Sequence, residues 1–292
     1  MGAVSRRPAL AAGIAAAVLC LGSAAAPGAA PEAPRRVVSL SVCVDQVLVD
    51  LADPGQIASI TYQAADPAYS RVWRKAKRFY LNRGTAEEVI RLRPDLVFAD
   101  PFNARATVHL LRRLGTRVVS LPNATTIPQI EAFVATVAGL LGQSKRGNDA
   151  IAAMRRRLSA VRPPAEGVRP VLVLVWSRGY SPGRGTVADT AIRAAGFRNF
   201  TAMQGVVGMK QLALETLITA RIDALAITGT GDSGASIATE WLRHPALDSL
   251  RAAVPHIDLR GSLLSCGTPA VAGAIERLYR LRERVGHYSG TK

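Results

Sequence analysis

The sequence predicts an α/β protein built as two Rossmann-like lobes, each with a central, mostly parallel sheet, joined by one long interdomain helix. Its 292 residues exceed the usual size of a single hydrophobic core, so two lobes are expected. Strand-like apolar runs alternate with helical patterns, which is typical of parallel sheets covered by helices on both faces. One long helical segment, residues 144–161, separates two such series.

The first series forms the predicted N-terminal lobe, residues 34–142. Thr85 has the character of a helix N-cap, and Gly115 and Gly142 are placed where helices end. Residues 61–83 are expected to be irregular. The expected strands are 36–40, 56–60, 95–99 and 117–121, and the expected helices are 44–52, 86–90, 104–114 and 127–141.

The connecting helix is assigned to residues 143–162. Its apolar residues Ile151, Met154 and Leu158 are spaced by three and four, and Pro163 with Pro164 stops it. The predicted C-terminal lobe covers residues 168–288. Its expected strands are 171–176, 224–228 and 256–259, and its expected helices are 187–195, 212–220, 236–243 and 269–285.

The first 25 residues have the pattern of a signal peptide. Arg6 and Arg7 precede an apolar stretch, residues 9–21, that is too short to span a bilayer. Small residues follow, and cleavage is expected after Ala25. The arginine pair leaves both the general secretory and the twin-arginine export routes open. The mature protein is therefore expected to be exported into an oxidising compartment.

The chain is strongly basic, with a formal net charge of +16. Removing residues 1–25 takes away two arginines and no acid, so 16 minus 2 leaves +14. The arginines are scattered and no aromatic residues alternate with them, so a nucleic-acid surface is not predicted. Arginine-rich coding bias explains most of the charge.

Two cysteines remain in the mature chain, Cys43 and Cys266. Each follows a predicted strand, the first strand of one lobe and the last strand of the other. Ligands of doubly wound sheets bind outside the carboxyl ends of the strands. Both cysteines are therefore expected to line or border the cleft. The sequence leaves open whether they form a disulfide or remain unpaired thiols.

The same rule about strand ends selects the other candidate ligand-binding residues. They are polar or aromatic side chains that follow predicted strands, a mixture that suits a large and partly apolar ligand. The alternative role for each aromatic is plain packing in the core or at the rim. The full set is Ser41, Cys43, Phe102, Trp176, Arg178, Tyr180 and Cys266.

No catalytic or metal-binding motif is found in the sequence. It contains no phosphate-binding glycine loop of either common type and no Gly-x-Ser-x-Gly nucleophile turn. The four histidines show no metal-ligand spacing with one another, with cysteine or with carboxylates. The prediction is a binding protein without a cofactor or metal site of its own, and not an enzyme.

A segment of the first lobe is repeated in the second. Residues 87–97 can be laid on residues 215–225, with Glu first, apolar residues at the third and fourth places, Arg seventh and Asp ninth. Both segments join a helix to a strand. The interpretation is an internal two-fold repeat, and the alternative is chance similarity between two common helix–strand units.

From Pro34 to about Leu281 the chain resembles the helical-backbone solute-binding proteins of ABC importers for ferric siderophores, heme and cobalamin. Residues 36–40 and 45–48 look like the family's opening strand and helix, residues 87–97 resemble its most recognisable motif, and the 144–161 helix resembles its connector. The resemblance implies a periplasmic, monomeric protein that delivers a chelate containing iron or cobalt to a permease in the inner membrane. It also implies that Glu87 and Glu215 dock onto arginines of that permease.

The sequence departs from this family's pattern at several places. In the second-lobe repeat, Ile222 stands where the first lobe has Pro94. In the first lobe, Arg83 precedes the predicted helix at residues 86–90, where cobalamin binders have other residues. Ala195 and Ala274 lie near the positions of a second-lobe disulfide of the cobalamin binders. The few histidines argue against the related zinc and manganese binders. The alternatives are a binder of free transition metal and a two-lobed chelatase-like α/β enzyme.

Overall fold

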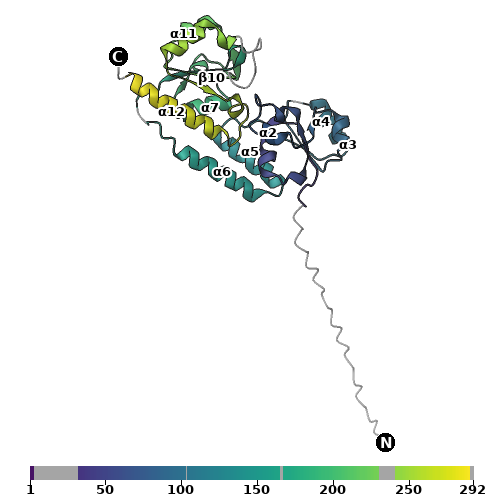
Figure 1. Cartoon of the computed structure of the whole chain (residues 1–292). Coiled ribbons are helices and arrows are strands. Elements are labelled where there is room, and N and C mark those ends of the chain that lie inside the picture. The colour runs from purple at the N-terminus through teal and green to yellow at the C-terminus, as the bar shows by residue number, and fades with distance from the viewer. Residues whose placement is uncertain (3–31, 103, 165–166, 230–240, 290–292) are drawn as a thin grey trace. The chain divides into compact units, whose positions relative to one another are not determined.

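Five parallel strands form the sheet of the N-terminal lobe, in the order β3-β2-β1-β4-β5. The structure is a computed structural model (Figure 1), and it describes residues 1–2, 32–102, 104–164, 167–229 and 241–289. The strands and helices of this lobe are β1 (Val37–Ser39), α1 (Val42–Leu51), β2 (Ile57–Thr61), α2 (Trp73–Ala76), β3 (Leu81–Asn82), α3 (Ala86–Arg91), β4 (Leu96–Ala99), α4 (Arg105–Arg113), β5 (Val118–Ser120) and α5 (Ile127–Leu140), with 3-10 turns η1 (Pro54–Gln56) and η2 (Tyr62–Ala65).

The C-terminal lobe contains a second parallel sheet, in the order β11-β10-β6-β8, and a separate antiparallel pair, β7 with β9. Its elements are β6 (Val171–Val175), η3 (Ser177–Gly179), β7 (Tyr180–Pro182), α7 (Val187–Ala194), β8 (Arg198–Asn199), α8 (Phe200–Met203), β9 (Met209–Gln211), α9 (Leu214–Ile218), β10 (Ala224–Thr228), η4 (Trp241–Arg243), α11 (Pro245–Ala253), β11 (His256–Leu259), η5 (Gly261–Leu263) and α12 (Val271–Ser289).

The two sheets follow the same plan. The opening strand of each lobe, β1 or β6, is an inner strand of its sheet. On one side it pairs with the strand that follows the repeated helix of that lobe. That helix and strand are α3 and β4 in the first lobe and α9 and β10 in the second. The sequence repeat therefore occupies equivalent places in the two lobes, and the fold class predicted from the sequence is confirmed.

The largest cluster of buried apolar residues is shared by the two lobes. It includes residues of α1 and α5 from the first lobe and of α7 and α12 from the second, with Ile151 and Met154 of the connecting helix between them. Two smaller clusters cover the other faces of the sheets, one beneath α3 and α4 and one beneath α9 and α11. Because one apolar core runs across both lobes, each lobe buries part of its surface against the other.

The connecting helix is α6 (Ser144–Ser159), which packs against α5 and α12 (Figure 1). Gly147 lets α6 approach α5 closely, because an added Cβ would lie 2.4 Å from the Cβ of Ala138. On the other side Arg157 makes a two-pronged ion pair with Glu276 of α12, at 2.8 and 2.7 Å. The helix therefore contacts both lobes along its length and is more than a linker.

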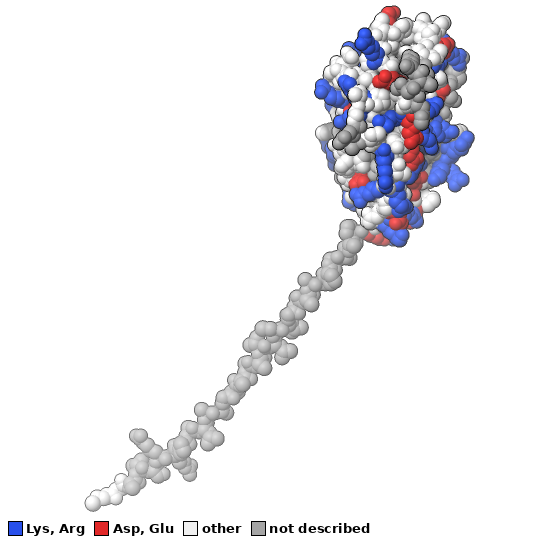
Figure 2. Space-filling model, turned by 90° about the vertical axis from the view of Figure 1, so that its left-hand side faces the viewer, with Lys and Arg blue, Asp and Glu red and all other residues white. Residues whose placement is uncertain are grey.

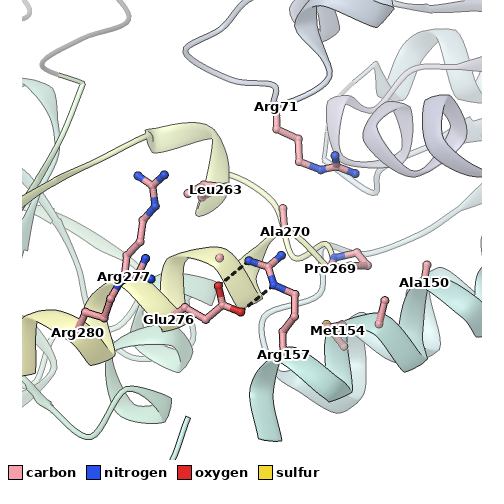
Figure 3. Close-up of a pocket in the computed structure, with 12 residues that line it drawn as sticks. Arg71, Ala150, Met154, Arg157, Leu263, Pro269, Ala270, Glu276, Arg277 and Arg280 are labelled. Carbon is pink, nitrogen blue, oxygen red and sulfur yellow. Dashed lines mark hydrogen bonds and ion pairs between the residues drawn. The ribbon is translucent and has the colours of Figure 1, made fainter. Parts of the chain in front are cut away.

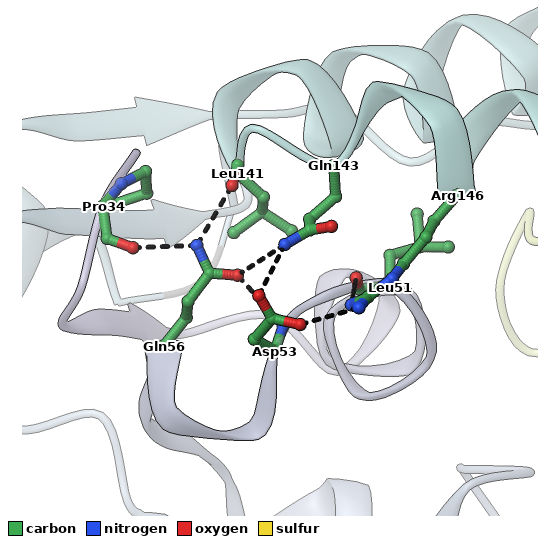
Figure 4. A network of polar contacts seen from close by, with 7 residues as sticks. All are labelled: Pro34, Leu51, Asp53, Gln56, Leu141, Gln143 and Arg146. Carbon is green, nitrogen blue, oxygen red and sulfur yellow. Dashed lines mark hydrogen bonds and ion pairs between the residues drawn. The ribbon is translucent and has the colours of Figure 1, made fainter. Parts of the chain in front are cut away.

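A network of polar contacts holds the turn before α6 to the first lobe (Figure 4). Gln56 donates hydrogen bonds to the carbonyls of Pro34 and Leu141, at 2.9 and 3.0 Å. Gln143 donates to Asp53 at 3.0 Å, and Arg146 pairs with the same carboxylate at 2.7 Å. The start of the connecting helix is thus tied to the loop between α1 and β2.

Several short elements were not expected from the sequence. Residues 61–83, predicted to be irregular, contain α2 and the edge strand β3. The second lobe adds β7, β8, β9, α8 and α11. These elements are short or lack a strong period, so tertiary contacts decide them. The predicted signal peptide falls mainly outside the described residues, as does most of the predicted 236–243 helix. No helix in the described part of the chain combines the length and apolarity that crossing a membrane requires.

Candidate functional site

A pocket of about 310 Å³ lies at the carboxyl ends of the first-lobe strands. Leu40 and Val42 follow β1, Thr61 and Tyr62 lie at the end of β2, and Asp100 follows β4. Parallel strands point their carboxyl ends to one edge of the sheet, so residues far apart in sequence meet there. The remaining lining residues are Gln63, Asn82, Arg83, Gly84 and Ala104.

The floor of this pocket is polar and buried. Thr61 donates two hydrogen bonds to Oδ2 of Asp45, from its amide at 3.1 Å and from its hydroxyl at 2.5 Å. Asn82 donates to the carbonyl of Ser39 at 3.0 Å and to the hydroxyl of Ser59 at 2.6 Å. Oδ1 of Asp45 and Oδ1 of Asn82 are buried acceptors with no hydrogen-bond partner among the described residues. A buried polar atom of this kind is commonly satisfied by water or by a ligand.

Asp45 is completely buried in the first turn of α1. Burial raises the pKa of its carboxyl from 3.8 to about 7, although the hydrogen bonds from Thr61 favour the charged form. Removal from water disfavours a charge more than these few donors favour it. Beneath the pocket, in contact with its lining residue Thr61, lies a carboxyl group whose pKa burial has raised close to neutrality.

The rim of the pocket is aromatic and cationic. Tyr62 is 53% exposed, and the guanidinium of Arg83 lies 5.7 Å from the centre of its ring. Sequence reasoning did not select Tyr62 as a site residue, because it lies in the segment that was expected to be irregular. The available signal was its position directly after the apolar run of β2, the same position that selected the other candidates.

None of the predicted ligand-binding residues of the first lobe, Ser41, Cys43 and Phe102, lines this pocket, although each lies within two residues of one that does. Ser41 is buried and precedes α1, and Cys43 is the second residue of that helix. Both are neighbours of Val42, which lines the pocket. Phe102 is 70% exposed after β4, with its amide donating to Asp100 at 2.8 Å. Phe102 is available to a ligand, whereas Ser41 and Cys43 lie under the surface.

Three of the four predicted residues of the second lobe, Trp176, Arg178 and Tyr180, gather in one turn after β6. The amide of Trp176 donates to the carbonyl of Tyr180 at 2.7 Å, which closes the turn. Arg178 has a left-handed backbone, with φ at 60°, and Tyr180 is 42% exposed. The indole N–H of Trp176 is buried and has no partner among the described residues. Gly179 is required here, since a Cβ would lie 2.7 Å from the ring of Trp241.

Cys43 and Cys266 form a disulfide, with their Cα atoms 5.3 Å apart. It joins the start of α1 in the first lobe to the loop between η5 and α12 in the second. Ser265 donates to the carbonyl of Tyr69 at 2.8 Å, and Gly267 approaches Ala124 so closely that a Cβ would lie 1.9 Å from its carbonyl oxygen. We call these contacts of residues 265–267 with the first lobe the interlobe seam.

Glu87 and Glu215 occupy equivalent positions, because each is the second residue of its helix, α3 or α9. Both are exposed. Neither belongs to an ion pair among the described residues. The neighbouring Glu88 has a different role: its carboxylate accepts from the amides of Arg83 and Thr85, completing a capping box. Acids in the first turn also interact favourably with the helix dipole, which remains the alternative role of Glu87 and Glu215.

A larger cavity, about 540 Å³, lies between α6, α12 and Arg71 of the first lobe (Figure 3). Figure 3 shows Arg157 turned toward Glu276, so this arginine already has its counter-charge. Arg71 is likewise paired with Asp50. One face of the molecule carries many Lys and Arg side chains with acids among them (Figure 2). Because this cavity lies against the connecting helix and not at the strand ends, we do not assign it as the principal ligand site.

The described residues contain no group of three or more histidines, cysteines or acids arranged to hold a metal ion. His244 accepts a hydrogen bond from the amide of Ala246 at 3.2 Å and caps α11. His109 lies exposed on α4.

Three comparisons relate the chain to known proteins. The family model described as periplasmic binding protein matches residues 37–255. Cobalamin-binding proteins of two Halobacterium salinarum strains are 26% identical over 199 residues, covering 67% of this chain and 54% of theirs. The match thus spans about half the length of these curated relatives.

Solved structures share the fold. A periplasmic heme-binding protein from a Roseiflexus species has a TM-score of 0.69 at 23% identity, covering 86% of this chain and 98% of that one. An ABC-type Fe3+-hydroxamate transport protein from Saccharomonospora viridis has a TM-score of 0.64 at 20% identity, covering 85% and 93%. At sequence identities of 20 to 23%, these similarities show that the chain shares the two-lobed fold of these proteins.

Proposed function

Because the chain belongs to the periplasmic binding protein family, we propose that it is the solute-binding component of an ABC importer. In this role it captures a ferric siderophore, heme or cobalamin between its lobes and delivers it to the membrane permease. The observation that carries the proposal is the pairing of two equivalent α/β lobes with polar and aromatic residues at their strand ends. Such strand ends are where doubly wound sheets bind ligands.

The chemistry of the first-lobe pocket supports a bulky, partly apolar ligand with polar groups at its edge. Tyr62 offers an exposed aromatic face at the rim, with the guanidinium of Arg83 beside it, and Phe102 is exposed two residues after the lining residue Asp100. Asn82 supplies a buried acceptor at the floor. A few polar groups within an aromatic wall are typical of small-molecule sites, where apolar area supplies affinity and the polar groups supply orientation. The names of the similar proteins include cobalamin, heme and Fe3+-hydroxamate.

The ligand class can be tested on protein purified from its own cells. We expect a native mass spectrum to show a bound chelate and the absorption spectrum to identify it, because heme, corrinoids and catecholate iron absorb differently. A Tyr62→Ala variant should bind that chelate at least about tenfold more weakly, the cost expected for losing one aromatic contact. Tyr80→Ala is the matched control, since Tyr80 is similarly exposed but does not line the pocket.

Three outcomes of this test would contradict the proposal. Protein that carries no chelate and binds none of hemin, cyanocobalamin or a ferric hydroxamate would exclude the proposed ligand classes. Binding of a bare transition-metal ion in their place would favour the alternative binder of free metal. Chemical turnover of a bound tetrapyrrole would favour the chelatase-like alternative.

The export of the protein is part of the same proposal. Residues 1–25 act as a signal peptide, and the mature protein works as a monomer in the periplasm. The supporting observation is the n-region and apolar stretch of the sequence. N-terminal sequencing of the mature protein should begin at Ala26, and a mature chain that retains Arg6 and Arg7 would contradict this.

The connecting helix leads to a prediction about motion. We expect ligand-free and ligand-bound forms to differ only by a small rotation of the lobes, because α6 is a continuous helix of 16 residues anchored at both ends. A helix resists bending more than extended linkers do. Small-angle scattering with and without the co-purified chelate would measure this, and a large ligand-dependent compaction would show that the helix does not limit the lobes.

A further inference from the structure

The interlobe seam joins the lobes at a second place, separate from the connecting helix. The chain itself crosses from one lobe to the other through α6, whose contacts lie on α5 and α12. The Cys43–Cys266 disulfide crosses at the strand ends, where α1 begins and the loop after β11 passes. Two covalent connections at different places restrain the rotation of two bodies more strongly than one connection does.

The seam lies beside the wall of the pocket. Cys43 directly follows Val42, a lining residue, and shares the first turn of α1 with Asp45, which holds Thr61 of the pocket floor. On the other side, Cys266 belongs to the segment that follows β11. Strand β11 pairs with β10 in the second-lobe sheet. A displacement of Cys266 from Cys43 would therefore move second-lobe strand ends relative to the pocket.

The packing around the disulfide is tight. Cys43 and Cys266 are 6% and 2% exposed, and both belong to the core that the lobes share. Gly267, next in the chain, has room for no side chain against Ala124. The amide of Thr268 donates to the carbonyl of Cys266 at 2.9 Å, which keeps this short loop folded on itself. The disulfide is thus part of a close-packed contact and not a loose tether.

We propose that Cys43 and Cys266 are positioning residues, whose disulfide fixes the separation of the two cleft walls and so sets the size of ligand that the protein accepts. This inference rests on the proposed function, because it takes the strand ends as the ligand site. The cysteines act through the elements they hold: α1 with the pocket floor on one side, and the loop after β11 on the other.

The test measures the distance between the lobes without any ligand. Spin labels are attached through non-canonical amino acids at Arg113 of α4 and Ser249 of α11, both exposed, in the otherwise native oxidised chain. We expect pulsed electron paramagnetic resonance to give a single narrow distribution of distances between the two labels. In the Cys43→Ser/Cys266→Ser variant the distribution should broaden and extend to longer distances. A second label pair at Arg113 and Ala135, both within the first lobe, should remain unchanged.

Loss of a disulfide also lowers stability by releasing the unfolded chain from a constraint, so a lower unfolding temperature alone would not support positioning. The distances are therefore compared at a temperature where far-UV circular dichroism shows every variant folded. Cys43→Ala/Cys266→Ala keeps the site apolar and provides the same comparison if the serine variant does not fold. An unchanged distribution between the lobes in the folded variant would overturn the proposal, as would two free thiols in the exported protein. Because no ligand is present, these results are independent of the chelate-binding test.

Discussion

Replacing both Glu87 and Glu215 with Lys is expected to abolish uptake while leaving ligand affinity unchanged. The two glutamates are exposed second residues of equivalent helices, one on each lobe. Under the proposed function, a two-fold permease would offer two equivalent basic sites, which a pair of matched acids fits. Each reversal would set like charges against the permease, and a cost of about 3 kcal/mol corresponds to roughly 100-fold weaker docking.

The measurement is uptake of the chelate by cells that carry the double variant, together with the affinity of the purified protein. A matched control is Asp258→Lys with Glu283→Lys, which changes the net charge equally at two other exposed acids that belong to no ion pair among the described residues. Glu88 is unsuitable as a control because its carboxylate caps α3. Wild-type uptake by the double variant would show that these glutamates only stabilise their helices. An equal loss of uptake in the control variant would show that the change in overall charge, and not the position of the two glutamates, causes the loss.

Asp45→Asn is expected to remove much of the pH dependence of stability. The pKa of Asp45 is raised by burial to about 7, whereas the unfolded chain has the ordinary value of 3.8. The folded protein therefore holds this proton more tightly than the unfolded chain does. The stabilisation is fully present below about pH 4, decreases as the pH rises, and is lost once the pH passes about 7. The difference corresponds to roughly 4 kcal/mol in the free energy of unfolding.

Urea unfolding at a series of pH values would measure this effect. Wild-type protein should lose stability between about pH 4 and pH 8 relative to the variant, which has no proton to release at this position. The acids Glu131 and Glu276 act in the opposite direction, since hydrogen bonds from Arg155 and Arg157 lower their pKa values. Comparison with the variant removes their contribution, because both proteins contain them. Asp248→Asn, at an exposed acid of α11, is the control; parallel wild-type and Asp45→Asn curves would refute the assignment.

The elements with a strong local signal were predictable from the sequence. Strand β10 was expected at residues 224–228 and β11 at residues 256–259, and both are found there. Thr85 caps α3 as expected, because a Thr three residues before a Glu forms a local capping box that needs no tertiary contact. The connecting helix was also expected, since its apolar period and the prolines that follow it are local features.

The elements without such a signal were missed. Strand β3 has two residues, and its pairing with β2 brings Asn82 into the pocket. Two residues are too few to show a period, so the segment around them was predicted to be irregular. The predicted set of rim residues was incomplete for the same reason. Tyr62 and Arg83 both lie within residues 61–83, the segment that was predicted to be irregular.

By itself the sequence determined the two-lobed α/β architecture, the connecting helix and the positions of the strand ends, because periodicity and capping are properties of neighbouring residues. Only the tertiary structure decided that Cys43 and Cys266 are bonded and that Asp45 is buried with an altered proton affinity. The two sulfurs are 223 positions apart in the sequence, and the Asp45 carboxyl is removed from water by elements remote from it in the chain. Distances and burial of this kind arise when the lobes pack, and no local pattern encodes them.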